Sequence, residues 1–212
     1  AGSADDTELF ETVFRLLTAF SELRTRETLC ASMRLQADCG PLLLDTTCTY
    51  RKTVCDGTTL QSIQAHGITV YFTADAACLA DGSVASDAAL ADTKCAALLE
   101  LAYQAVLDGD CTFEEANGTV TYTLSQNAEQ LRDAATAIAP DTAQDDLRLT
   151  DGTVQIVWAN GIIESIRFQI DGKMQIVLSE TAISLSAALT FPAQTTDEEA
   201  TVPAAVRAAL VQ

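Results

Sequence analysis

Residues 49–72, TYRKTVCDGTTLQSIQAHGITVYF, hold two glycine-marked turns between short segments in which apolar and polar residues alternate. Alternation with a period of two is the pattern of a strand with one buried face. Asp56-Gly57 and His66-Gly67 can adopt the positive φ angles that the primed turns of tight hairpins require. Two-residue loops at both places predict an antiparallel meander whose apolar side chains share one face. The predicted pairs are Tyr50–Ile63, Ile63–Val70 and Ala65–Ile68.

Similar turn signals recur along the chain, where seven of the ten glycines are the second residue of a candidate two-residue turn between alternating segments. Such closely spaced turns predict a chain in which each strand pairs antiparallel with the next one. The candidate turns are Cys39-Gly40, Asp56-Gly57, His66-Gly67, Asn117-Gly118, Asp151-Gly152, Asn160-Gly161 and Asp171-Gly172.

A two-residue loop at Cys39-Gly40 extends the meander toward the N-terminus. This register also places Cys30 and Cys48 on opposite faces of the sheet, so we expect no disulfide between them. Because the chain has seven cysteines, at least one thiol lies outside any intramolecular pairing. The predicted pairs are Leu35–Leu44, Ala31–Cys48 and Leu29–Tyr50.

Residues 146–191 predict the last block of strands, with a turn at Asp151-Gly152. That turn pairs Leu147 and Leu149 with Ile156 and Val154. To keep the apolar residues of the next strands on one face, three-residue loops are needed at 159–161 and 171–173. A further turn is expected at 179–182. The residues that should share the face are Val154, Ile156, Trp158, Ile166, Phe168 and Ile170.

Four segments predict helices. Residues 7–23 carry apolar side chains at three-and-four spacing, and residues 88–107 have so few polar members that burial around most of the helix is implied. A third helix is expected at 127–138, stopped by Pro140, and a short one at 202–211. Residues 75–86 are expected to be irregular.

About eleven strands and these helices predict an α+β fold: a large, curved antiparallel sheet that forms an open half-barrel, with helices covering its concave face. We expect one half-barrel domain over residues 1–191, including the N-terminal helix, and an acidic linker with a short helix over residues 192–212.

The net charge of −18 excludes nucleic acid as a partner, because phosphate backbones would repel the chain. No catalytic or cofactor motif occurs, and the single histidine, His66, is explained by its turn. The acids around Gly109 (Asp108, Asp110, Glu114 and Glu115) do not have the spacing of a calcium loop. We therefore expect no catalytic residue, no metal and no cofactor. A hydrolase or isomerase in a curved-sheet pocket is the least favoured hypothesis.

The order of elements from about Thr7 to Phe191, a helix, a long meander, inserted helices and a closing run of strands, resembles the LolA-like superfamily. This superfamily includes periplasmic lipoprotein carriers and lipid-binding envelope lipoproteins. The resemblance includes no signature motif, so no functional residue is carried over. It implies an unclosed barrel with an apolar cavity that shields an acyl chain or glycolipid.

Two functional hypotheses follow. The first is an exported bacterial, non-enzymatic protein that holds a lipid or another apolar molecule in the half-barrel. The alternative is a cell-envelope structural or interaction module with a filled core and no ligand. Tyr50 and Trp158 suit a cavity mouth, because each has an apolar body and a polar end. The ligand-lining candidates are Tyr50, Phe72, Trp158, Phe168, Ile170 and Phe191.

The N-terminal residues 1–6 are small and polar and do not begin with Met. This start is expected either for an extracytoplasmic protein, secreted or held at the envelope through an N-terminal anchor that has been removed, or for a sequence that simply begins at an arbitrary point; we take the first as our expectation. A cluster of basic residues near the first two strands is a candidate docking patch for an anionic partner, or else the solvated face of the sheet. Its members are Arg24, Arg26, Arg34, Arg51 and Lys52.

Overall fold

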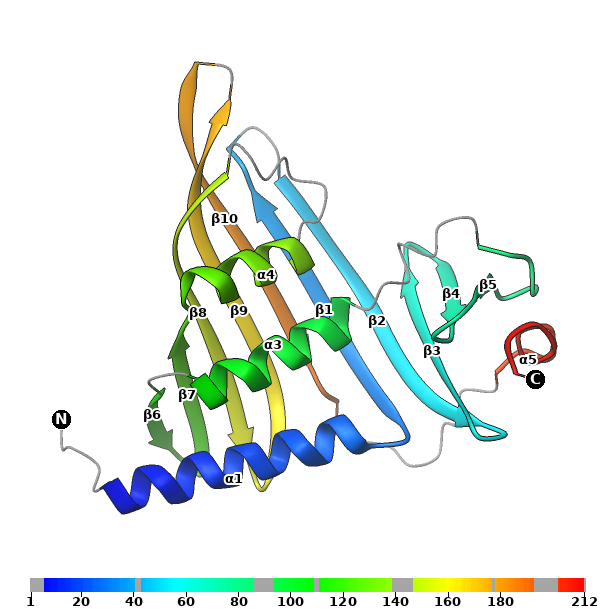
Figure 1. Cartoon of the computed structure of the whole chain (residues 1–212), viewed down its shortest axis with the longest axis horizontal. Coiled ribbons are helices and arrows are strands. Elements are labelled where there is room, and N and C mark those ends of the chain that lie inside the picture. Colours follow the sequence, from blue (N-terminus) through cyan, green and yellow to red (C-terminus); the bar gives the residue numbers. More distant parts are fainter. Residues whose placement is uncertain are drawn as a thin grey trace.

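The computed structural model describes residues 6–40, 43–85, 94–108, 111–138, 147–176, 178–192 and 202–211. These residues form one open sheet of ten antiparallel strands and four helices (Figure 1). The predicted class, an α+β fold with a large open antiparallel sheet, is confirmed. The helices are α1 (Asp6–Thr25), α3 (Lys94–Asp108), α4 (Ala128–Ile138) and α5 (Ala204–Leu210). The strands are β1 (Leu29–Asp38), β2 (Leu43–Cys55), β3 (Thr58–Ala65), β4 (Ile68–Phe72), β5 (Ala77–Leu79), β6 (Cys111–Ala116), β7 (Thr119–Ser125), β8 (Leu147–Ala159), β9 (Ile162–Ile176) and β10 (Ser179–Thr190).

The sheet consists of two meanders of five strands joined edge to edge. Its order is β5-β4-β3-β2-β1-β10-β9-β8-β7-β6, so every strand pairs with its neighbour in sequence except at the joint, where β1 pairs with β10. The joint is long and regular, running from Ser32 opposite Thr190 to Asp38 opposite Ser184.

Four of the glycine-marked turns are tight two-residue hairpins. Asp56, His66, Asn117 and Asn160 all have positive φ, and so does the glycine that follows each of them. The pairs predicted around the first two turns are confirmed, with Tyr50 opposite Ile63, Ile63 opposite Val70 and Ala65 opposite Ile68.

The predicted register between β1 and β2 is wrong by two residues. Leu35 lies opposite Thr46, Ala31 opposite Tyr50 and Leu29 opposite Lys52. The cause is a longer connection, because β1 ends at Asp38 and β2 begins only at Leu43. A shift of two residues leaves every side chain on its predicted face.

The facing of two cysteines is therefore unaffected by the register error. Cys30 pairs with Arg51 and Cys48 with Met33, which places the two cysteines on opposite faces of the sheet, as predicted. Cys48 is buried on the helix side, whereas Cys30 is only partly buried.

Two glycines that predicted turns lie instead within long strands. Gly152 belongs to β8, where a Cβ would overlap Leu131 of α4. Gly172 belongs to β9, where a Cβ would lie 2.7 Å from the carbonyl oxygen of Arg148 beside a β-bulge. Both positions need glycine for close approach and not for a turn. The predicted turns at 151–152 and 171–173 are wrong, which removes two strands from the expected eleven. The short strand β5, in the stretch expected to be irregular, adds one.

The other connections of the last block also differ from prediction. The β8–β9 loop has two residues, not three, since Ala159 pairs with Ile162. A β-bulge at Glu164 supplies the extra residue instead, so the apolar side chains of β8 and β9 still share one face, with Ile156 opposite Ile166 and Val154 opposite Phe168. No turn occurs at 179–182, because these residues already pair with β9.

The helices begin and end close to the predicted bounds. The part of the 88–107 helix before residue 94 lies outside the described residues. A reciprocal cap starts α4: Asn127 Oδ1 accepts hydrogen bonds from the backbone N–H groups of Glu129 (3.0 Å) and Gln130 (2.9 Å), and Gln130 Oε1 accepts one from the N–H of Asn127 (3.1 Å). Such an arrangement satisfies N–H groups that the helix itself leaves without partners.

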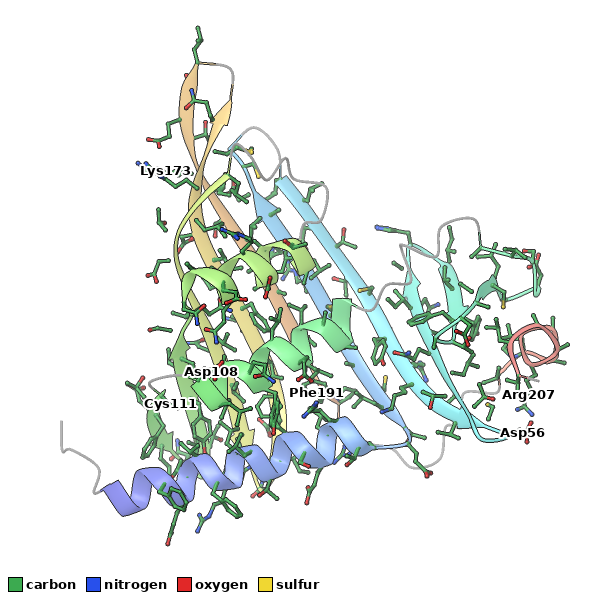
Figure 2. All side chains as sticks on the ribbon, in the orientation of Figure 1. Asp56, Asp108, Cys111, Lys173, Phe191 and Arg207 are labelled. Atoms are coloured by element: carbon green, nitrogen blue, oxygen red, sulfur yellow. The ribbon has the colours of Figure 1, made fainter. Side chains whose placement is uncertain are left out.

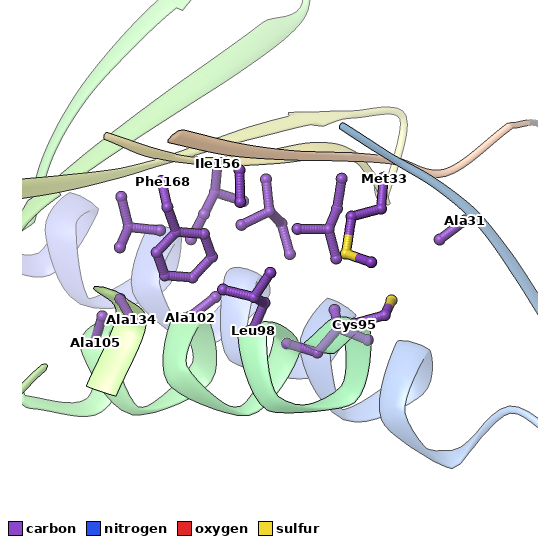
Figure 3. Close-up of a cluster of buried hydrophobic side chains, with 14 of the residues drawn as sticks. Ala31, Met33, Cys95, Leu98, Ala102, Ala105, Ala134, Ile156 and Phe168 are labelled. Carbon is purple, nitrogen blue, oxygen red and sulfur yellow. The ribbon is translucent and has the colours of Figure 1, made fainter. Parts of the chain in front are cut away.

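Three helices, α1, α3 and α4, lie across one face of the sheet (Figure 1). Between them and the strands is the main core, where Met33, Ile156 and Phe168 point toward Cys95 and Leu98 of α3 (Figure 3). All five side chains are at most 1% exposed. Side chains fill this layer, and its stability comes from apolar surface removed from water.

The fourth helix covers the opposite face. Leu60 and Cys78 are buried with Val206 and Leu210 of α5 in a second, small cluster. Leu60 and Ile63 are three residues apart on β3 and so point to opposite faces; Ile63 packs against the main core. The helices predicted to cover the sheet, α1, α3 and α4, thus lie on one face, and α5, predicted as a short helix of the C-terminal tail, packs on the other.

Candidate ligand-binding clefts

The first cleft lies where the C-terminal end of α1 and the start of α3 meet strands β1, β2 and β3. Its volume is about 270 Å³, just under the usual range for ligand sites. Its lining residues are Leu23, Arg24, Leu29, Tyr50, Lys52, Thr59, Gln61, Ala96, Leu99 and Glu100.

The floor of the first cleft is apolar. Leu23, Leu29 and Leu99 are each at most 6% exposed, so the cleft reaches the edge of the main core. Tyr50 donates a hydrogen bond from its hydroxyl to Gln61 Oε1 at 2.7 Å. Burial raises the pKa of Tyr50 far above its ordinary value, so the phenol stays neutral.

The rim of the first cleft is charged. Arg24 forms an ion pair of 2.7 Å with Glu100 and lies 4.3 Å above the ring of Tyr103. Lys52 donates a hydrogen bond from Nζ to the backbone oxygen of Arg24 at 3.3 Å. Glu100 is thus neutralised by Arg24, whereas no ion pair with a described carboxylate involves Lys52. The rim therefore carries a net positive charge beside an apolar floor.

The second cleft lies between the N-terminal half of α1 and the end of the sheet formed by β6, β7 and β8. Its volume is about 230 Å³. In Figure 2, Cys111 labels β6, the edge strand next to this cleft. Lys173 of β9 labels the ends of the strands that extend beyond the helices, away from the cleft. The lining residues are Glu11, Thr12, Arg15, Phe113, Glu115, Val120, Tyr122 and Trp158.

The six predicted lining residues do not come together at one site. Tyr50 lines the first cleft and Trp158 the second. The other four pack in the main core, at most 7% exposed, and line neither cleft. They are Phe72, Phe168, Ile170 and Phe191. A role of any of the six in ligand binding stays a prediction.

Sequence reasoning placed Arg24 and Lys52 in a candidate docking patch for an anionic partner, but it connected neither residue with Tyr50 or Glu100. A signal was present, because Lys52 lies two residues from Tyr50 on the same strand and must share its face. The basic cluster around β1 and β2 in fact divides between the faces. Lys52 reaches the first cleft, and Arg34 bonds to Asp45 on the other side of the sheet. Only the helices bring Glu100 to Arg24.

Other candidate chemistry lies at exposed positions. His66 is an exposed turn residue with positive φ. Glu114 and Glu115 are exposed on the edge strand β6, whereas Asp110 lies outside the described residues. Within the described ranges, no three histidine, cysteine or acidic side chains cluster as metal ligands. None of the helices in that part of the chain has the length and apolar character to cross a membrane.

No protein-family model and no curated protein sequence matches this chain. Among solved structures, it is similar to the Mycobacterium tuberculosis lipoprotein LppX, with 11% identity over 85% of this chain and 93% of that one and a TM-score of 0.40. It is also similar to a DUF1329 family protein from Desulfovibrio piger, with 9% identity over 91% and 98% of the two chains and a TM-score of 0.31. At these values the likeness is one of general fold and assigns no ligand. Membership of the LolA-like superfamily stays a prediction.

Proposed function

We propose that this protein binds, without chemical conversion, a molecule with an apolar chain and an anionic head in the first cleft, and that it acts outside the cytoplasm. The observation that supports this proposal is the apolar floor of Leu23, Leu29 and Leu99 directly beside the positive rim at Lys52. An amphiphile such as a fatty acid matches both surfaces, because its chain is removed from water while its carboxylate stays near a cation.

The groups in this cleft favour binding over catalysis. The one phenol, Tyr50, has a raised pKa and donates to the neutral amide Gln61. The one carboxylate, Glu100, is held by Arg24. A nucleophile such as a hydroxyl is commonly activated by a base within hydrogen-bond reach, and Tyr50, the hydroxyl with a described partner in this cleft, donates to an amide and not to a base.

The test uses a fluorescent fatty acid, 11-(dansylamino)undecanoic acid, titrated into the full chain. Ala96, which lines the cleft on α3, is replaced by Phe to fill the space. We expect the Ala96→Phe variant to weaken binding by about tenfold or more, since the new ring occupies the volume that the chain would take. The matched control is Ala97→Phe, one position along the same helix, where the side chain is exposed.

A second variant tests the rim. Lys52→Gln should weaken binding of the fatty acid and leave binding of an uncharged dansyl amide of similar length nearly unchanged. Equal affinity of the parent, Ala96→Phe and Ala97→Phe for the fatty acid would contradict the proposed site. Absence of binding by the parent chain, together with no amphiphile in an organic extract of the purified protein, would contradict the function.

A second candidate function, an interaction module with a filled core, is favoured by two exposed rings on α1. Phe10 is 72% exposed and Phe14 is 61% exposed, and their i, i+4 spacing places them on one side of the helix. If these rings bind a second copy of the chain, sedimentation velocity will show a concentration-dependent dimer that Phe10→Ser/Phe14→Ser abolishes. A monomer at every concentration would count against this candidate.

A further inference from the structure

The second cleft has aromatic walls contributed by three consecutive strands. Phe113 of β6, Tyr122 of β7 and Trp158 of β8 all line it. Phe113 and Tyr122 are direct cross-strand partners, and their ring centroids lie 6.3 Å apart with the planes tilted by 42°. Val120, which lies opposite Trp158, completes this wall.

The polar groups of Tyr122 and Trp158 are not exposed at the surface of the cleft. The hydroxyl of Tyr122 donates to the backbone oxygen of Thr12 at 3.4 Å. The indole Nε1 of Trp158 is buried and has no hydrogen-bond partner among the described residues. Tyr122 is only 1% exposed, so the ring surface that the wall offers to a ligand comes from the half-buried Phe113 and Trp158, whose π faces carry partial negative charge.

The opposite wall and the rim add two carboxylates and one cation. Glu11 and Arg15 of α1 line the cleft, and Glu115 comes from β6. The Glu11–Arg15 ion pair is long, at 3.9 Å, and its side chains are 65% and 66% exposed, so water screens the attraction between them. The cleft thus has an excess of one negative charge, within a chain of net charge −18.

We propose that the second cleft binds a quaternary or methylated ammonium group. Aromatic faces attract a cation that is too large and too poorly hydrated to prefer water, and nearby carboxylates add to this attraction. An anionic ligand would meet two carboxylates, and a neutral apolar ligand would gain nothing from them. Arg15 is the resident cation, and an incoming ammonium group competes with it for Glu11.

The chain has a single tryptophan, so the fluorescence of Trp158 reports on this cleft alone. We would titrate choline into the full chain and compare it with 3,3-dimethylbutan-1-ol, in which carbon replaces the charged nitrogen. We expect a saturating change with choline and binding of the uncharged analogue that is weaker by about tenfold, because the analogue lacks the cation–π attraction.

Two charge variants give opposite predictions. Glu115→Gln should weaken choline binding by several-fold, because it removes an attractive charge. Arg15→Gln should strengthen it, because it removes the competing cation. The control is Glu114→Gln, the neighbouring residue on β6, which is exposed and does not line the cleft; its affinity should equal that of the parent.

The ammonium group can belong to a free solute or to a lipid headgroup, and the two sources are separated by vesicles. A response to choline identifies a free solute, and a response only to phosphatidylcholine vesicles, absent with phosphatidylglycerol vesicles, identifies a headgroup. Either result supports the proposal. No response to either probe in fluorescence or calorimetry, equal affinity for the uncharged analogue, or weaker binding by Arg15→Gln would overturn it. Because the fatty-acid probe tests the first cleft, failure of one proposal leaves the other intact.

Discussion

The two ends of this sheet are built in different ways. Strands β1 and β7–β10 carry one buried face beneath α1, α3 and α4, and β10 shows the regular alternation that such burial produces. Strands β3–β5 instead divide their apolar residues between the faces, with Ile63 toward the main core and Leu60 under α5. Most buried apolar residues of β1 and β7–β10 therefore belong to one large core cluster, whereas those of β3–β5 are divided between this cluster and the small one under α5.

The filled centre of the main core explains why both clefts lie at its margins. The centre of the main core is filled, with Phe168, Ile166 and Leu98 fully buried. Both clefts lie at the margins of the helix layer, one at each end of α1. Helix α1 crosses several strands. Its middle packs closely on them, whereas near its two ends the side chains of α1 and of the strands no longer interdigitate, which leaves space for a cleft.

The largest effect is expected in the middle of the covered region. Phe168→Ala removes a fully buried ring between the sheet and α3, and it should lower the free energy of unfolding by about 3–5 kcal/mol. Urea denaturation followed by far-UV circular dichroism measures this loss. A cost below 1 kcal/mol would mean that the layer is loosely packed and would remove the contrast between the two regions.

The next effect concerns the β3–β5 region. Val206→Asp places a charge in the small cluster, where Val206 is fully buried. We expect α5 to detach, at a cost of about 2–3 kcal/mol, because one buried aliphatic side chain contributes about that much. Amide hydrogen exchange should become fast in α5 while β9 and β10 keep their protection. Loss of protection throughout the sheet would show that α5 supports the whole fold.

A smaller effect is expected where α4 meets the sheet. Gly152→Ala adds a Cβ that overlaps the end of the Leu131 side chain, which must move; the cost should be about 1–2 kcal/mol. The comparison is Gly57→Ala in the β2–β3 turn, where nothing surrounds the added atom but φ is +80°. There the cost is about 1 kcal/mol of backbone strain. Only Gly152→Ala should increase hydrogen exchange in α4.

The smallest effect at neutral pH belongs to Tyr122. Burial raises the pKa of Tyr122 to about 12 from about 10 in an unfolded chain. The stabilisation from its neutral form is therefore complete below pH 10 and is lost as pH rises toward 12. Tyr122→Phe should cost about 1 kcal/mol or less at pH 7, through the hydrogen bond to Thr12. The variant should also lose stability less steeply than the parent between pH 10 and 12. Identical alkaline profiles would contradict this assignment.

Some elements of the fold were predicted correctly because residues next to each other in the chain determine them. The turns at Asp56-Gly57 and His66-Gly67 and the helix that begins after Asn127 follow from neighbouring residues alone. Gly152 and Gly172 gave the same dipeptide signal, but their role depends on Leu131 and Arg148, contacts that no local pattern contains. The difference is physical: a glycine that permits positive φ and a glycine that admits a close neighbour look alike in sequence.

The clefts depended even more on tertiary contacts. Tyr50 and Trp158 were identified as candidates because of their two-sided chemistry, and each lines a cleft. Phe72 and Phe168 have the same apolar character but lie inside the core, since the helices and not the strands decide which part of the inner face stays accessible. The approach of Glu100 to Arg24, from two different helices, could not be read from spacing in the chain.

The joint between β1 and β10 has a consequence for how the chain acquires its fold. Met33 must find Leu189 across more than 150 intervening positions, and closing so large a loop costs entropy before any contact compensates for it. During synthesis, the first five strands leave the ribosome with the outer edge of β1 open until the last strand arrives. A partner that shields this edge, or a delay in folding until the whole chain is available, would prevent another molecule from pairing with it first.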